Sequence, residues 1–153
     1  MLQVFIVAFI VVLDQVTKYL AKTYLKPVGS IPLIPNVFHF TYVENRGAAF
    51  GILQNQRWLF IVLTVVVSAV IVYYLFTRSQ ESIVLTIALS MILGGAIGNL
   101  IDRLRLGYVV DMLHFVLIDY PVFNVADSFV VIGTILLAYY ILFMADSRER
   151  QLS

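Results

Sequence analysis

Two aspartates in the second half of the chain are the candidates for catalysis. Asp111 follows three apolar residues, and Asp127 lies near the start of a long apolar segment. Two carboxylates that share a site of low dielectric cannot both ionise readily, so one of them keeps its proton. The ionised carboxylate can then activate water while the protonated one polarises a carbonyl group, the chemistry by which a carboxyl pair hydrolyses a peptide bond. The spacing alone leaves open that the two acids are buried separately, as helix caps or as partners of arginine.

Asp14 and Lys18 form a second group of ionisable residues, inside the first apolar segment. Their i, i+4 spacing places them on one face of a helix, where their charges neutralise each other. Charged groups inside a membrane are costly and are therefore functional candidates. Two interpretations stay open: a structural ion pair that supports helix packing, or a pair that positions other residues of the site.

A glycine-rich run, GGAIGN, begins at Gly94 and ends at Asn99. The small-xxx-small spacing of Gly94 and Gly98 predicts close contact between helices, and a phosphate-binding loop is a poor alternative within an apolar helix. Asn99 and Arg103, again four residues apart, would project from the end of this helix. Arg103 either extends to the membrane surface or pairs with Asp102, or else it shapes the substrate site.

Other chemistries find little support in the sequence. His39 and His114 do not form HExxH or another metal-ligand spacing, and no serine lies in a GxSxG motif. The chain has no cysteine, which excludes disulfides and thiolate catalysis. The net charge of +1 provides no basic face for nucleic acid. We therefore expect no cofactor, no metal and no nucleic-acid partner.

The elements that must position these residues are membrane helices. The chain is 61% hydrophobic and only 12% charged, against about 25% charged residues in soluble domains. A spanning helix needs about 20 mostly apolar residues, and four segments qualify: Leu2–Leu20, Trp58–Phe76, Ile83–Ile101 and Phe123–Met144. No Lys or Arg precedes the first segment and no small-x-small site closes it, so we expect a retained helix rather than a cleaved signal peptide.

Two longer connections, 21–57 and 102–122, have the character of β-structure. In the first, turn residues precede a stretch in which Phe38, Phe40 and Tyr42 alternate with polar residues, the period of a half-buried strand. In the second, Gly107–Phe115 is β-rich. The predicted fold is thus a membrane all-α protein, one domain over residues 1–153, with four transmembrane helices and a small β-sheet cradle and loop on one membrane face.

Alternating helices bring both long connections and the noteworthy polar groups to one membrane face, which we call the working face. Lys and Arg number six on the working face (Lys22, Lys26, Arg46, Arg57, Arg103, Arg105) and three on the opposite face (Arg78, Arg148, Arg150). The positive-inside rule would place the working face in the cytoplasm. Several of these charges are also candidates for site or sheet residues, so the charge count leaves the orientation open.

The chain resembles the bacterial lipoprotein signal peptidases (signal peptidase II) in five blocks that follow the order of that family. The blocks are Asp14–Lys18 (DQVTK), Asn45–Phe50 (NRGAAF), Gly94–Arg103 (GGAIGNLIDR), Val109–Asp111 (VVD) and Phe123–Asp127 (FNVAD). One block alone would be a weak signal. Five blocks in order, in a chain with four predicted helices, are highly specific.

The resemblance implies an aspartic endopeptidase of the bacterial cytoplasmic membrane. It would remove the signal peptide from diacylglyceryl-modified prolipoproteins by cutting just before the lipidated cysteine, with these substrates and membrane lipids as its partners. Asp111 and Asp127 would be the catalytic pair. Residues implied to bind substrate or shape the site are Asn45, Asn99, Arg103, Asn124, Asp14, Lys18 and Gly95. The resemblance also implies cytoplasmic termini and an external working face, contrary to the charge count.

Three other functions agree less well with the sequence. A proton-coupled carrier would hold its acids near the bilayer midplane, whereas here the polar residues gather at one face and Trp58–Phe76 contains no charge. A membrane scaffold gives no reason for five polar blocks at that face. A presenilin-type protease would carry GxGD, which is absent.

Overall fold

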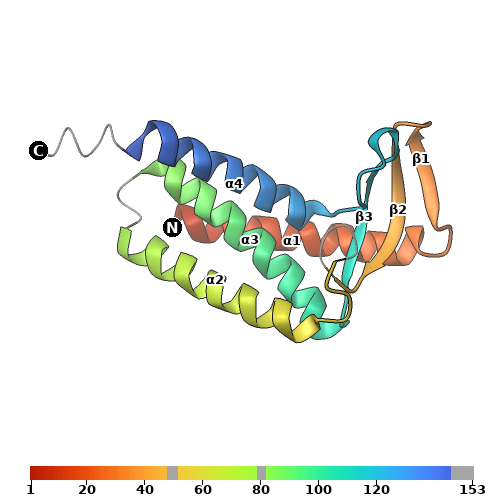
Figure 1. The fold of residues 1–153 in the computed structure, drawn as a ribbon, viewed down its shortest axis with the longest axis horizontal. Coiled ribbons are helices and arrows are strands. Elements are labelled where there is room, and N and C mark those ends of the chain that lie inside the picture. Colours follow the sequence, from red (N-terminus) through yellow and green to blue (C-terminus); the bar gives the residue numbers. More distant parts are fainter. Residues whose placement is uncertain (48–51, 79–81, 146–153) are drawn as a thin grey trace, which may run out of the picture.

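Four helices form the body of the molecule. The computed structural model describes residues 1–47, 52–78 and 82–145. The helices are α1 (Leu2–Leu20), α2 (Arg57–Arg78), α3 (Ile83–Arg105) and α4 (Val125–Phe143), and a π-helical segment, Ala21–Leu25, continues α1. All four are long and apolar enough to cross a membrane, which confirms the predicted helices (Figure 1).

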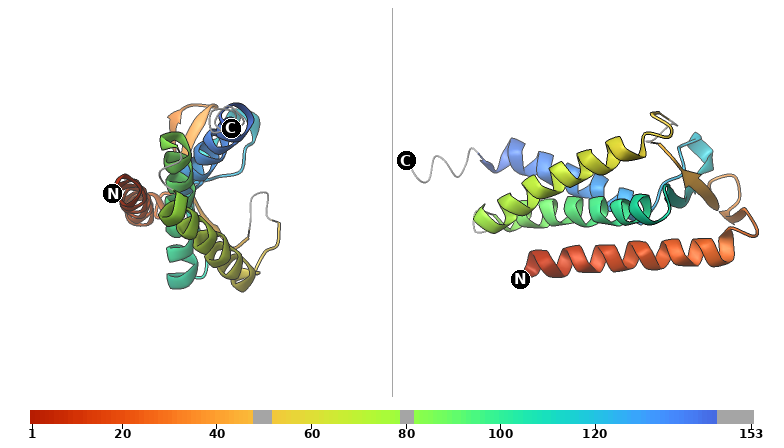
Figure 2. Two further views of the ribbon diagram at one scale, coloured as in Figure 1. Left: turned by 90° about the vertical axis from the view of Figure 1, so that its left-hand side faces the viewer. Right: turned by 90° about the horizontal axis from the view of Figure 1, so that it is seen from below.

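Helix α3 lies at the centre of the bundle and packs against the other three helices. In the most apolar 18-residue stretch of each helix, 61% of the residues of α3 are buried, compared with 22% or less in each of the other helices. Figure 2 shows the same arrangement from the end of the bundle. Glycines make the close packing possible: Gly94 faces Ile10 of α1, and Gly95 faces Ala126 and Val130 of α4. The predicted role of this run in helix contact is confirmed.

A three-stranded antiparallel sheet crosses one end of the bundle (Figure 1). Its order is β1 (Ser30–Ile34), β2 (Phe38–Asn45), β3 (Val109–Phe115). A small hydrophobic core joins the sheet to the end of the first helix, and its buried members are Ala21, Leu25, Val110 and Met112. The sheet is therefore attached to the same end of the bundle that carries the polar residues.

The structure corrects several predicted boundaries. Strand β1 was missed, because Pro32 and its neighbouring turn residues indicated a loop. Helix α3 continues past Ile101 to Arg105, and α4 begins at Val125 rather than Phe123. Three stretches lie outside the described residues: 48–51, which includes the end of the NRGAAF block, 79–81 between α2 and α3, and the tail 146–153.

Candidate active site

Strand β3 supplies the first aspartate of the site. Asp111 pairs with Val43 of β2 in the sheet register, and only 1% of Asp111 is exposed. Asn45, at the end of β2, donates from Nδ2 to Asp111 Oδ2 at 3.0 Å. The Oδ1 atom of Asn45 accepts from the backbone N–H of Gly47 at 2.9 Å, so the orientation of this amide is fixed by two partners.

The first turn of α4 supplies the second aspartate. Asn124 is the N-cap, and its Oδ1 accepts from the backbone N–H of Asp127 at 2.9 Å. Asp127 Oδ2 in turn accepts from the backbone N–H of Asn124 at 3.2 Å, which completes a capping box. The remaining group of Asn124, Nδ2, donates to Asp111 Oδ1 at 2.6 Å. One amide side chain therefore links the two aspartates.

Asn99 of α3 connects Asp127 to the buried cation of α1. Asn99 Nδ2 donates to Asp127 Oδ1 at 2.7 Å, and Asn99 Oδ1 accepts from Lys18 Nζ at 2.8 Å. An ammonium group can only donate. Lys18 therefore holds the amide oxygen of Asn99 on its own side and turns the NH₂ group toward Asp127.

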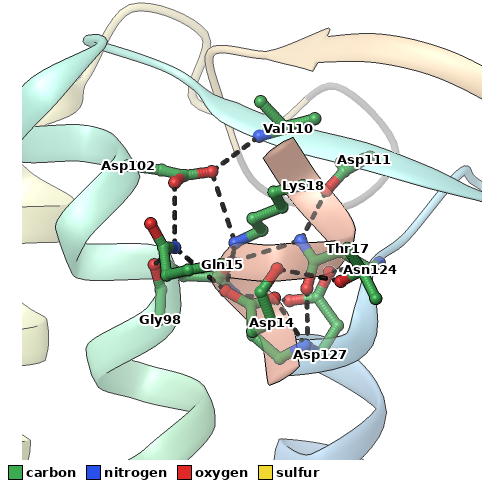
Figure 3. A network of polar contacts seen from close by, with 12 residues as sticks. Asp14, Gln15, Thr17, Lys18, Gly98, Asp102, Val110, Asp111, Asn124 and Asp127 are labelled. Atoms are coloured by element: carbon green, nitrogen blue, oxygen red, sulfur yellow. Dashed lines mark hydrogen bonds and ion pairs between the residues drawn. The ribbon is translucent and has the colours of Figure 1, made fainter. Parts of the chain in front are cut away.

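The predicted ion pair between Asp14 and Lys18 is present, with Lys18 Nζ 2.9 Å from Asp14 Oδ2 (Figure 3). Both side chains are almost completely buried. The pair also reaches the site: Asp14 Oδ1 accepts from the backbone N–H of Ala126, next to Asp127, at 3.0 Å. Thus the two interpretations of this pair are compatible, because the same ion pair packs α1 and contacts the first turn of α4.

Asp102 and Gln15 complete the buried cluster, and the sequence analysis assigned neither of them to the site. Asp102 lies 3.3 Å from Lys18 Nζ and accepts from the backbone N–H of Val110 at 3.0 Å. Gln15 Nε2 donates to both Asp14 and Asp102, each at 3.2 Å. Their signal in the sequence was weak, since spacing along one helix does not reveal contacts between α1 and α3.

A cavity of about 290 Å³ opens in front of the two aspartates. Five predicted site residues line it: Asn45, Asn99, Arg103, Asp111 and Asp127. The other four predicted residues lie behind its wall in contact with lining groups or their neighbours: Asp14, Lys18, Gly95 and Asn124. Its apolar lining includes Phe60, Val122 and Val131. The arrangement offers two carboxylates and several amides to a peptide backbone, beside an apolar surface.

Arg103 projects toward this cavity rather than toward Asp102. Its guanidinium carbon lies 4.9 Å from the centre of the Phe60 ring, and Nη2 lies 3.5 Å from the carbonyl oxygen of Gly47. Within the described residues, Asp102 pairs with Lys18 instead. The pairing of Arg103 with Asp102 that the sequence left open is therefore not found.

The aromatic residues of β2 face the body of the protein. Phe40 and Tyr42 pack against the core that joins the sheet to Leu25 and Met112. Phe38 contacts the ring of Phe115 at 5.0 Å between centroids. Phe40 and Tyr42 therefore hold the sheet on the bundle, whereas Phe38 packs within the sheet.

The pKa of Asp111 is raised to about 7, chiefly by burial and next by the negative charge of Asp127. The hydrogen bonds from Asn45 and Asn124 and the charge of Lys18 act in the opposite direction. Asp111 therefore gains and loses its proton around neutral pH, far above the pH at which an ordinary aspartate does so. Across the described part of the chain, no cluster of three His, Cys, Asp or Glu side chains is placed to bind a metal.

Comparison with known proteins gives matches along nearly the whole chain. The sequence model of the family described as Signal peptidase (SPase) II matches residues 6–143. A lipoprotein signal peptidase of Caldanaerobacter subterraneus is 58% identical over 143 residues, which cover 94% of this chain and 97% of the relative. That of Clostridioides difficile is 48% identical over 150 residues, which cover 98% and 100%.

Two solved structures share the fold. Both are bacterial membrane enzymes studied by the in meso method. One, at 2.3 Å resolution, has a TM-score of 0.86 and 37% identity, and the match covers 92% of this chain and 87% of that chain. The other, at 1.9 Å, has a TM-score of 0.84 and 36% identity, with 94% of each chain covered.

Proposed function

The chain belongs to the signal peptidase II family, and from this premise we propose how its polar cluster acts. The protein is an aspartic peptidase of a bacterial membrane that removes signal peptides from prolipoproteins. We propose that it cuts diacylglyceryl-modified substrates just before the lipidated cysteine, with Asp111 and Asp127 as the catalytic pair. The observation that carries this proposal is the Asn124 amide, which bonds to both aspartates at the wall of one cavity.

The surroundings of the two carboxyl groups support different roles for them. Asp127 lies at a helix N-terminus, which favours a negative charge, and it accepts hydrogen bonds from Asn99 and from backbone. Asp111 carries the shared proton in this proposal, because burial raises its pKa to about 7. In the proposed reaction, Asp127 takes a proton from water and the hydroxyl oxygen attacks the scissile carbonyl carbon, whose oxygen receives a hydrogen bond from Asp111. The C–N bond then breaks, and the leaving amine takes the proton held by Asp127.

The position of the cavity suits a substrate that is anchored in lipid. It lies at the sheet end of the bundle, where α3 ends and α4 begins. We propose that this end faces outward from the cytoplasmic membrane, and that the opposite end, where α1 begins and α4 ends, faces the cytoplasm (Figure 1). The whole chain, 1–153, would act as one peptidase domain, with lipid-modified prolipoproteins and membrane lipids as partners.

A cleavage assay in detergent tests the substrate proposal. Purified protein is incubated with a prolipoprotein whose cysteine carries diacylglycerol, and with the same prolipoprotein lacking the lipid. We expect a gel shift for the lipidated substrate and none for the unmodified one, because the lipid brings the scissile bond to the cavity. Equal cleavage of both substrates would contradict the proposed lipid requirement, and mass spectrometry of the product would show whether the cysteine is its first residue.

The rate of cleavage should depend on pH with two limbs, since the pair works with one proton. With the pKa of Asp111 at about 7, the rate should fall as pH rises through this value and the shared proton is lost. Asn45→Ala removes a hydrogen bond that lowers this pKa, so the alkaline limb should move to higher pH by about one unit. The measurement is kcat/KM across the stable pH range. A flat profile, or a limb that stays in place in the variant, would contradict the shared proton.

The raised pKa of Asp111 also makes the stability of the folded protein depend on pH. The folded pKa of Asp111 lies above its ordinary value of 3.8, so the folded state binds the proton more tightly than the unfolded state. The contribution of Asp111 to stability is therefore fully present below pH 4 and is lost as pH rises to about 7.

A further inference from the structure

Six basic side chains lie at the sheet end of the bundle, and the structure shows partners for four of them. Arg103 lies over the ring of Phe60 and donates to the carbonyl oxygen of Gly47 at 3.5 Å. Arg57 donates to the carbonyl oxygen of Leu104 at 2.9 Å. The other two, Lys26 and Arg46, approach Glu44 at 2.8 Å and 3.9 Å. Four of the six basic side chains therefore have a partner within the protein, and for Lys26 and Arg46 this partner is a carboxylate.

The remaining two, Lys22 and Arg105, have no carboxylate partner among the described residues, and both are exposed. They come from different elements, Lys22 from the π-helical segment after α1 and Arg105 from the last turn of α3. Both line the same small pocket between these elements. Two unneutralised cations thus face one space.

This pocket is separate from the active-site cavity, with which it shares no lining residue. Its volume is about 100 Å³, roughly the room of three water molecules, which suits a phosphate group and is too small for a larger ligand. Buried Lys18 and Asp102 form part of its wall. Lys18 is already paired with Asp102 and, behind the wall, with Asp14, so the open side of the pocket carries the two charges of Lys22 and Arg105 and the whole group has an excess of one positive charge.

The pocket lies at the level of lipid headgroups. The first membrane-spanning segment ends at Leu25 and the third ends at Arg105, so the cations of the pocket are at one boundary of the hydrocarbon layer. An apolar strip continues from the pocket along α1, formed by Tyr19, Val16 and Val12, which are 67%, 48% and 62% exposed. Residues at this spacing share one helix face, and the strip offers contact to an acyl chain below the headgroup.

We propose that this pocket binds the phosphodiester headgroup of an anionic membrane phospholipid. Lys22 and Arg105 hold the two unesterified phosphate oxygens, and the acyl chains lie along the α1 strip. Basic pockets between membrane helices are a known setting for anionic headgroups. The binding does not depend on the peptidase reaction, so it can be tested on the whole protein without substrate.

Native mass spectrometry of the delipidated protein in uncharged detergent tests the proposal. The protein is titrated with phosphatidylglycerol and, separately, with phosphatidylcholine of the same acyl chains. We expect one phosphatidylglycerol to be retained with a preference of roughly 30-fold, which is what two basic side chains near an anionic headgroup supply. The double variant Lys22→Gln/Arg105→Gln should lose this preference. The matched pair Lys26→Gln/Arg46→Gln, which removes the same charge from the Glu44 cluster, should keep it.

Several outcomes would overturn the proposal. Equal retention of the two lipids by the wild type would show no anion site, and equal losses in both double variants would show only a general effect of charge. Full displacement of the lipid by millimolar inorganic phosphate would show a site for a free anion. If Lys22 and Arg105 act only on the helix C-termini, the double variant will melt at lower temperature and keep the lipid preference. Should the double variant fail to fold, each single variant is expected to lose about fivefold.

Discussion

Asp127→Asn is expected to lower the cleavage rate by roughly 10³- to 10⁴-fold, and Asp111→Asn should have an effect of the same size. An amide cannot take a proton from water, and it is a much weaker hydrogen-bond donor than a carboxylic acid to the oxygen on which negative charge develops. Acid–base groups contribute about 10² to 10⁴ in rate each. Because the two carboxyl groups act as one unit, the double variant should be little slower than either single variant. The measurement is kcat on the lipidated prolipoprotein.

Both variants need a folding measurement beside the rate. Each oxygen of Asp111 accepts a hydrogen bond from an amide, Asn45 or Asn124. An asparagine at position 111 would place its own NH₂ group against one of these donors, and the lost hydrogen bond would lower the stability by about 1–3 kcal/mol. Thermal unfolding of each variant will show whether the bundle survives this cost.

Asp119→Asn is the matched control for these two variants. Asp119 is exposed in the loop before α4 and has φ of 48°, a conformation that asparagine adopts readily. We expect this control to keep full activity. Near-normal activity of a folded Asp111 or Asp127 variant would refute the pair.

Gly95→Ala should have the second largest effect, although Gly95 does not line the cavity. A Cβ at this position would meet the carbonyl oxygen of Ala126 and lie 2.7 Å from Val130 Cγ2. Helix α4 would have to move away from α3, and Asp127 would move with it while Asp111 stays on β3. Overpacking of this kind costs about 1–3 kcal/mol, and a displacement near 1 Å can lower a rate about 100-fold. We expect both a lower melting temperature and a loss of kcat of about that size.

Two variants separate this geometric effect from a loss of stability. Gly94→Ala directs its Cβ toward Ile10 of α1, 2.9 Å away, so it should destabilise the bundle while folded protein keeps most of its activity. Ala138→Val adds bulk to the exposed face of α4 and should change neither property. If Gly95→Ala is destabilised but cleaves at the normal rate per folded molecule, the α3–α4 contact does not set the position of Asp127.

The helices could be predicted because membrane lipid imposes a length and a composition on each of them. The ends of the helices were harder to predict, because the apolar segment can end before the last hydrogen-bonded turn of the helix. Helix α3 runs on to Arg105 since Asp102, although charged, is buried against Lys18 and the backbone of Val110. The spacing of apolar residues does not predict that a charged residue is buried beside an oppositely charged side chain of another helix.

Strand β1 was not predicted, because a proline in the local sequence indicates a turn. The strand forms only through its pairing with β2, which the local sequence does not reveal. Pro32 has no N–H to donate, which argues against a central strand but not against an edge. In the sheet order β1 is an edge strand, and Pro32 is paired with His39 beside a register shift. Only the presence of β2 as a neighbour makes the segment a strand.

The residues of the site could be named from the sequence, but their connections could not. The resemblance to a family pointed to Asn99 and Asn124 as site residues without indicating their orientation. That orientation comes from Lys18, which bonds to Asn99 Oδ1, and from the capping box of α4. The capping box is local, but the contacts of Asn99 with Lys18 and with Asn124 join segments 81 and 25 residues apart in the chain.

The buried ion pair of α1 also bears on how the protein is made. Helix α1 is synthesised and inserted first, before any partner from α3 or α4 exists, and an isolated charge within a membrane helix costs about 2.5–3.5 kcal/mol at the centre. Because Asp14 lies one turn from Lys18, the nascent helix contains both members of the ion pair and can remain in the lipid until α3 and α4 are inserted. Asp102 arrives with α3, and Asp127 arrives only with the last helix. A partly synthesised chain therefore lacks one of the two proposed catalytic carboxylates and cannot cleave its neighbours at the site of insertion.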